Sequence, residues 1–275
     1  MNKKTTLLIR DRYNEYLSWY FYLWAPVILI SSVAILPIRG ATLGNIFSLL
    51  SPLIVIIFSK YQTTFRYAWI LLFFIISYIL LCIFSQIGIL SIGIPAFGQV
   101  ILTDPTDKSI FLRTSLFSQS LYLFSGVLTF LFLYLFYQPK WDRFIFFGAI
   151  ILSCYGLYEI VYFQIFGENG DFISNRIFGH GRNVNNRGAI FATMNLGSFK
   201  LLRLKSLTGE PSMYAFTILP FWIYALHTRK FKTTLILFIS LIFTISTTAY
   251  LGIIIYLILN LLINHKITRI SKILL

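Results

Sequence analysis

Seven long apolar runs constrain the fold of this chain more than any other feature. A helix needs about 20 mostly apolar residues to cross the roughly 30 Å hydrocarbon core of a bilayer. The runs cover residues 20–38, 43–59, 67–94, 116–138, 144–166, 212–226 and 234–263. Charged residues make up only 12% of the chain, whereas a soluble domain has about 25%. The sequence therefore excludes a water-soluble enzyme and predicts an all-α, multi-pass membrane protein.

The last apolar run, 234–263, is too long for one ordinary span. It is interrupted by Ser246, Thr247 and Thr248, residue types whose side chains bond to nearby backbone and favour bends. We expect two short helices that meet near Thr248, and a single tilted helix is the alternative. With two crossings here, the chain is a single transmembrane domain over 1–275 with about eight spans.

The distribution of basic residues predicts the orientation of these spans. With the N-terminus inside, the cytoplasmic segments carry 14 Lys and Arg residues, and the short outer segments carry only Arg39, Lys108 and Arg113. Such an asymmetry follows the positive-inside rule, and it places both termini in the cytoplasm only if 234–263 crosses twice. Topology also explains the net charge of +14, so we expect lipid as a partner and no nucleic acid.

One outer connection, 167–211, is much longer than the others and is predicted to be a large extracytoplasmic loop. It contains six basic residues and His180, and seven of the chain's 16 glycines. The basic residues are Arg176, Arg182, Arg187, Lys200, Arg203 and Lys205. Arginine binds phosphate in a bidentate manner, and glycine lets backbone amides turn toward an anion. The loop favours a phosphate-bearing ligand at the bilayer surface, and a loop that merely contacts lipid headgroups is the alternative.

The end of this loop leads directly into the sixth apolar run through Glu210, Pro211 and Ser212. Proline restricts the preceding residue to an extended conformation and is favoured in the first turn of a helix. We therefore expect a carboxylate at the outer mouth of a helix, a few residues from Arg203 and Lys205. On these residues alone, an ordinary helix start is the simpler interpretation.

The pattern Arg203-x-x-Ser206-x-x-x-Glu210-Pro211-Ser212, in an outer loop before a span, resembles the O-antigen and capsular polysaccharide polymerases of the O-antigen ligase/polymerase superfamily. The later segment 243–252 is similar to the polar break between two short helices in that family, with Thr247 or Thr248 where the family often has Arg. The resemblance covers the last third of the chain. The first 165 residues match only as generic spans.

This resemblance implies a glycosyltransferase in the plasma membrane that polymerises polyprenyl-diphosphate-linked oligosaccharide repeat units. Cations on the diphosphate stabilise charge that grows as the sugar–phosphate bond breaks. Arg203 is the first candidate, and Arg176, Arg182, Arg187 and Lys205 are further ones. Glu210, or else His180, would accept the proton of the acceptor hydroxyl. A flippase and a chain-length regulator are the partners that the resemblance implies.

Three other functions stay open at this point. A ligase would transfer finished polysaccharide by similar chemistry, and a transporter or flippase would move the lipid-linked saccharide. Because family members usually continue into further spans and a second outer loop, an inactive, truncated member is the third. The scattered histidines, at positions 180, 227 and 265, and the lack of paired carboxylates predict neither a metal nor a cofactor.

Glu159 lies inside the fifth apolar run, about two helical turns from its outer end. An ionisable residue in a membrane span is expensive and is by default a functional candidate. On a helix, Glu159 shares a face with Tyr155 and Tyr162. We count it as a catalytic candidate, and the alternative is a buried carboxylate bound by tyrosine hydroxyls or an arginine.

Overall fold

The computed structural model describes residues 15–36, 41–92, 114–175, 193–197 and 199–273, and these are mostly helical. They divide into two compact units. The first unit comprises residues up to 21 together with 45–139, and the second comprises 22–44 and 140–275. Each unit is described separately below.

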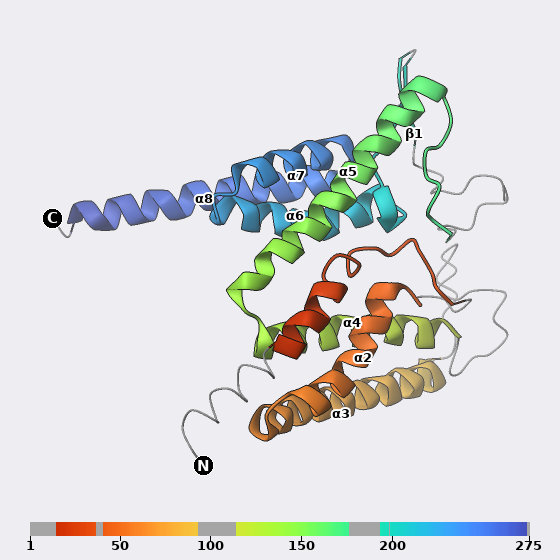
Figure 1. The fold of residues 1–275 in the computed structure, drawn as a ribbon, viewed down its shortest axis with the longest axis vertical. Coiled ribbons are helices and arrows are strands. Elements are labelled where there is room, and N and C mark those ends of the chain that lie inside the picture. Colours follow the sequence, from red (N-terminus) through yellow and green to blue (C-terminus); the bar gives the residue numbers. More distant parts are fainter. Residues whose placement is uncertain (1–14, 37–40, 93–113, 176–192, 198, 274–275) are drawn as a thin grey trace. The chain divides into compact units, whose positions relative to one another are not determined.

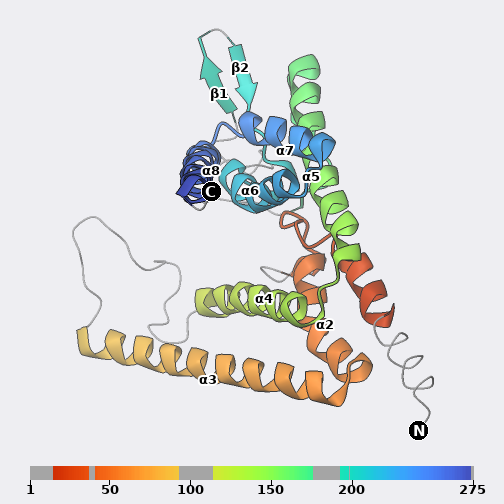
Figure 2. The same cartoon turned by 90° about the vertical axis from the view of Figure 1, so that its left-hand side faces the viewer.

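The first unit is built from apolar helices (Figure 1). It contains most of α2 (Leu43–Phe58), α3 (Tyr61–Ile92) and α4 (Thr114–Phe136). α3 packs against α4, and the two run side by side in Figure 2. Hydroxyl groups link α2 to α4, because Ser48 and Thr129 share a hydrogen bond of 2.6 Å between their side-chain oxygens.

The second unit contains the segments on which the functional predictions fall. Its helices are α5 (Asp142–Phe166), α6 (Pro211–His227), α7 (Phe231–Phe243) and α8 (Thr247–Ile273). α6 packs against α7 and α8, and α5 packs against α7, so that α6, α7 and α8 lie side by side (Figures 1 and 2). Tyr214, Ile218, Leu237 and Leu241 are completely buried in its core.

The large loop predicted over 167–211 forms a β-hairpin before α6. β1 (Thr193–Leu196) pairs antiparallel with β2 (Phe199–Leu202), and the turn uses Gly197 at a φ of 62°. Polar and apolar residues alternate in β1, a pattern typical of a strand, within a stretch that the sequence predicts only as a loop. The hairpin stands beside the C-terminal end of α5 (Figure 2), and Gln164 at that end donates to the carbonyl of Lys200 at 3.4 Å. The prediction of a purely helical chain is therefore incomplete.

Three helices of the described chain are long and apolar enough to cross a membrane. They cover Tyr61–Gly88, Gln119–Phe136 and Pro139–Phe166, and each coincides with a predicted span. The helices Leu43–Phe58, Phe231–Phe243 and Thr247–Leu262 are apolar but shorter. The structure thus supports three of the eight expected spans by length and composition.

The first predicted span, 20–38, is not a continuous helix. The helix over residues 15–24 ends at Trp24, turns follow, and Ala34 forms an isolated bridge with Thr42. Pro26 has no backbone N–H to donate, and it comes two residues after the helix end. The amides of Ser31 and Ser32 instead donate to the carbonyl of Leu207, at 3.0 and 2.9 Å.

The last apolar run is divided as the sequence predicts, although not into two short helices. α7 ends at Phe243 and α8 begins at Thr247, so the break comes slightly before Thr248. Ile245 within the break has a φ of 45°, which β-branched residues rarely adopt. α8 has 27 residues and is longer than we expect for this half of the run.

Candidate functional site

The segment between β2 and α6, residues 203–210, contacts several other segments of the second unit, and we call it the 203–210 connection. Leu204 donates its amide to the carbonyl of Phe243 at 2.9 Å, and Leu207 accepts from the segment 31–32. Residues 204–208 are all buried. Buried irregular backbone requires partners for its polar groups, and the partners come from α5, from the α7–α8 break and from the segments around 31 and 171.

Arg203 lies at the break between α7 and α8. Its Nε donates to the carbonyl of Thr244 at 3.2 Å and its Nη2 donates to that of Ile245 at 3.0 Å. The last carbonyls of a helix have no intrahelical partner, and a basic side chain there satisfies them and interacts favourably with the helix dipole. Arg203, the residue predicted to bind the diphosphate, therefore joins the motif segment 203–212 to the polar break at 243–252.

Lys205 forms a buried ion pair with Asp171, through its Nζ and the carboxylate Oδ2. Lys205 is 1% exposed and Asp171 is 5% exposed. Ser174 also donates its amide to Asp171 Oδ1 at 3.0 Å, and Tyr155 donates its hydroxyl at 3.3 Å. The sequence predicts that the ammonium of Lys205 faces a ligand in an open loop, whereas the structure buries it against the carboxylate of Asp171.

The charge of Lys205 determines the protonation of Asp171. Burial of Asp171 raises its pKa, but the hydrogen bond and positive charge of Lys205, with the amide of Ser174, outweigh burial and hold the pKa below its ordinary value. Asp171 is therefore ionised at neutral pH. Breaking a buried pair by removing one partner leaves the other charge uncompensated.

Glu159 is completely buried in α5, and its carboxylate contacts the 203–210 connection. Oε2 accepts the backbone amide of Ser206 at 3.1 Å. Oε1 is buried and has no hydrogen-bond partner among the described residues. The alternative interpretation expects tyrosine hydroxyls or an arginine to bind Glu159. The structure differs, because the donor is the backbone N–H of Ser206 and Tyr155 instead bonds to Asp171.

Ser206 has a second bond to α5 and an unusual backbone conformation. Its hydroxyl donates to the carbonyl of Leu152 at 2.6 Å, and its φ is 50°. A left-handed conformation costs a residue other than glycine about 1–2 kcal/mol. The two bonds to α5 offset this cost and keep the turn at Ser206 against the helix.

Gly156 leaves room for this close approach. A Cβ atom at this position would be 2.7 Å from Leu204 Cδ2, closer than real Cβ contacts, and 3.0 Å from Ser206 Cβ, which is tighter than most of them. Leu152, Gly156 and Glu159 lie on one face of α5, at helical spacings of four and three. This face, which we call the α5 seat, receives residues 204–206.

Glu210 and Pro211 adopt the conformations that the sequence predicts. Glu210 is extended, with φ −134° and ψ 145°, and Pro211 occupies the first turn of α6. The carbonyl of Glu210 accepts the amide of Tyr214 at 3.0 Å. The Glu210 residue is half-buried, and its side chain makes no capping bond to α6.

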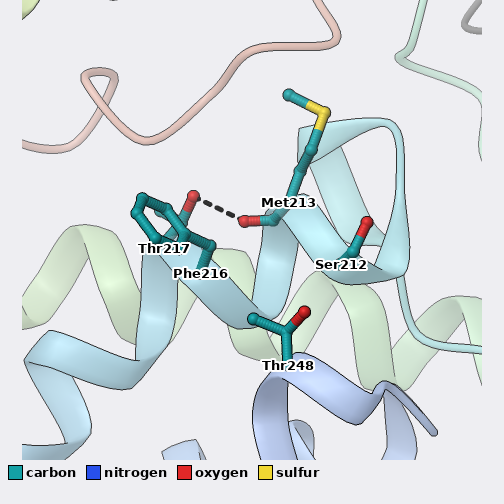
Figure 3. Close-up of a pocket in the computed structure, with 5 residues that line it drawn as sticks. All are labelled: Ser212, Met213, Phe216, Thr217 and Thr248. Carbon is teal, nitrogen blue, oxygen red and sulfur yellow. Dashed lines mark hydrogen bonds between the residues drawn. The ribbon is translucent and has the colours of Figure 1, made fainter. Parts of the chain in front are cut away.

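A shallow hollow of about 310 Å³ lies immediately after Glu210 and Pro211. Figure 3 shows its lining: Ser212 and Met213 from the first turn of α6, Phe216 and Thr217 from the next, and Thr248 from the first turn of α8. Thr217 donates its hydroxyl to the carbonyl of Met213 at 2.8 Å, and Phe216 is 77% exposed. The hollow is therefore mostly apolar, with hydroxyls at its edge.

Four predicted site residues lie outside the described residues, namely Arg176, His180, Arg182 and Arg187. Of the others, the structure brings Glu159 and Lys205 to neighbouring points of the 203–210 connection. Arg203 and Glu210 lie at its two ends. Within the described chain, no three His, Cys, Asp or Glu residues are grouped so that they could hold a metal ion.

Asp171, Gly156 and the carbonyls of residues 244–245 also belong to this site, although the sequence does not predict them. Asp171 has no motif around it and looks like one more charge in a polar loop. A signal for Gly156 was present, because a glycine three residues before a buried glutamate lies on the same helix face. Comparison with protein-family models, curated proteins and solved structures finds no match to this chain, so the geometry carries the functional argument.

Proposed function

We propose that this chain is a membrane glycosyltransferase that polymerises polyprenyl-diphosphate-linked oligosaccharide repeat units into a surface polysaccharide. One observation carries the proposal: the two segments that resemble the polymerase family, 203–212 and 243–252, meet in space. Arg203 bonds to the carbonyls of Thr244 and Ile245. Ser212 and Thr248 line the same hollow.

The reaction that suits this arrangement is a displacement at the anomeric carbon of the donor sugar. The acceptor hydroxyl oxygen forms a bond to that carbon, and the bond from the carbon to the diphosphate oxygen breaks. The diphosphate leaves with the electron pair, attached to its polyprenyl carrier. Glu210 accepts the proton of the acceptor hydroxyl, a role that typically contributes about 10²–10⁴-fold to a rate.

Charge on the leaving diphosphate needs positive partners near the hollow. The first turns of α6 and α8 both border it, and helix N-termini carry partial positive charge. Arg203 adds a full positive charge at the α7–α8 break. The apolar side chains of Met213 and Phe216 suit the isoprenoid part of such a substrate, since they offer no polar partner.

The proposed location is the plasma membrane, with both termini in the cytoplasm and the 203–210 connection outside. A flippase that delivers repeat units and a chain-length regulator would act beside it. A reporter fused after residue 179 should be active outside the cell, and one fused after residue 275 should be active inside. The opposite pattern would contradict the orientation and place the connection on the wrong side for an external substrate.

The decisive test of the activity is Glu210→Gln, which keeps the size of the side chain and removes the base. In cells whose own copy is deleted, this variant should produce single repeat units and no long polymer, read as the loss of the ladder on a polysaccharide gel. Glu168→Gln is the matched control, because Glu168 is an exposed carboxylate beyond the end of α5.

Arg203→Lys is the second variant, because it keeps the charge and loses the planar fork that binds two acceptors at once. It should shorten the polymer strongly at an unchanged protein level. A normal ladder in both Glu210→Gln and Arg203→Lys, with the protein present in the membrane, would overturn the proposed function.

A further inference from the structure

We propose that Glu159 is a positioning residue: it holds the 203–210 connection on the α5 seat and so determines where Arg203 and Glu210 lie. This role differs from that of a catalytic residue, because Glu159 acts through the backbone of Ser206 and touches no substrate. Its consequence for Arg203 and Glu210 rests on the proposed function. The attachment of the 203–210 connection to α5 does not depend on the proposed function.

The burial of Glu159 carries the first step. The side chain is 0% exposed, so it has no access to the hollow after Pro211 or to a sugar outside the membrane. A buried carboxylate is expensive unless it is bonded. Its bond is to the amide of Ser206 at 3.1 Å, and this makes Ser206 the group through which Glu159 acts.

The neighbouring ion pair carries the second step. Lys205 is paired with Asp171, and the next residue, Ser206, is bonded to Glu159. Two carboxylates from separate segments therefore hold two successive residues of one connection. The connection is thus attached at two successive residues between Arg203 and Glu210.

The α5 seat carries the third step. The hydroxyl of Ser206 bonds to the carbonyl of Leu152 at 2.6 Å, and Gly156 allows Leu204 and Ser206 to approach the helix. The α5 seat therefore holds residues 204–206 in two ways, by close packing at Gly156 and by hydrogen bonds to Leu152 and Glu159. Arg203 and Glu210 are three and four residues from Ser206 along the chain, so a shift at Ser206 moves both.

Hydrogen exchange of the Ser206 amide tests the hold directly, on the full chain in lipid nanodiscs. Glu159→Leu removes the acceptor and should accelerate exchange about tenfold or more, since the buried hydrogen bond of the Ser206 amide is lost. Glu159→Gln keeps an acceptor oxygen and should stay within about threefold of the wild type. Unchanged exchange in Glu159→Leu would overturn the proposal, whatever the activity of the protein.

Gly156→Ala provides a second route to the same shift without a change in charge. Its Cβ would press on Leu204 and Ser206, so exchange at Ser206 should again accelerate. Gly126→Ala is the matched control, because a Cβ at Gly126 of α4 would meet nothing within 4 Å. No acceleration in Gly156→Ala would count against the seat even if Glu159→Leu fails to fold.

Polymer length in the same variants separates this proposal from the proposed function. We expect Glu159→Leu to lose long polymer and Glu159→Gln to retain it. If Glu159→Gln loses polymer as completely as Glu159→Leu while its exchange is normal, Glu159 acts by its charge and the positioning role is wrong. Accelerated exchange with a normal ladder in Glu159→Leu supports the attachment of Ser206 and contradicts its consequence for Arg203 and Glu210, whereas the proposed function is overturned only by normal ladders in Glu210→Gln and Arg203→Lys.

Discussion

The two units of this molecule use polar groups in opposite ways. Among the described residues of the first unit, the polar contacts between helices are hydrogen bonds of neutral side chains, such as the bond of 2.6 Å between Ser48 and Thr129 and that of 2.7 Å from Ser125 to Asn45. In the second, Glu159, Asp171 and Lys205 are buried together beside an irregular segment. Neutral bonds suffice to join helices in lipid, whereas buried ionisable groups in a membrane protein usually accompany function.

The helices of the two units also differ in how much of them the protein covers. In its most apolar 18-residue stretch, none of α3 is buried, whereas 44% of that stretch of α5 is. A helix that is apolar on all sides and uncovered suits direct contact with lipid. The comparison teaches that the second unit is where packing is specific, and that substitutions there should have the larger effects.

The largest difference should come from Asp171→Asn, which leaves the ammonium of Lys205 buried without a counter-charge. Loss of one partner of a buried pair costs about 3–5 kcal/mol. We expect a fall of that size in the free energy of unfolding, measured by denaturant titration in detergent. The double variant with Lys205→Met should recover much of it. A fall below about 1 kcal/mol would mean that the buried pair contributes little to stability, and the proposed difference between the two units would be wrong.

Acid should weaken the same pair. Because Lys205 holds the pKa of Asp171 below its ordinary value, the contribution of the pair to stability is present above the ordinary pKa of about 4. It is lost as the pH falls through the lowered pKa. The wild type should therefore lose stability more steeply below about pH 4 than Asp171→Asn does. Parallel pH profiles for the two proteins would contradict the assignment.

A pair of glycine substitutions should give the next largest difference. A Cβ at Gly148 of α5 would lie 3.0 Å from the carbonyl oxygen of Ala25 and from Pro26 Cα, whereas at Gly126 of α4 it would meet nothing within 4 Å. Gly148→Ala should therefore cost about 1–3 kcal/mol through overpacking. Gly126→Ala should be neutral or add up to about 1 kcal/mol. Melting temperatures of the two variants, measured side by side, check the order.

The smallest effects should be those of hydroxyl groups, and here the units should behave alike. Ser153 shares a bond of 2.7 Å with Tyr214 in the second unit, as Ser48 does with Thr129 in the first. Bonds of this kind between membrane helices contribute about 0.6 kcal/mol on average. Ser153→Ala and Ser48→Ala should each cost about that much. A loss above about 2 kcal/mol at Ser153 alone would extend the contrast from charges to hydroxyls.

Local features of the fold could be predicted well from the sequence. The runs 67–94, 116–138 and 144–166 correspond to α3, α4 and α5. Pro211 begins α6 with Glu210 extended before it, because proline restricts its own φ and its neighbour. The same rule was available at Pro26, where the apolar composition of 20–38 hid the end of a helix at Trp24.

The candidate site could be predicted only in part. In the sequence, Glu159 stands out as an ionisable residue within an apolar run, and the segment 203–212 stands out separately as a motif. Their contact through the Ser206 amide joins residues 47 positions apart. Lys205 was expected to face a ligand, but Asp171, 34 positions away, pairs with it. No periodicity or spacing connects such residues, so no sequence pattern could have paired them.

The amino-acid sequence by itself determined that this chain forms apolar helices of membrane length, where α6 begins and that the last apolar run is broken. These properties depend on hydrophobicity and on backbone preferences within a few residues. Only the tertiary structure decided which groups share the buried interior of the second unit. A buried polar or charged group is tolerated only beside a partner, and that partner reaches Glu159 and Lys205 through the packing of segments distant in the chain.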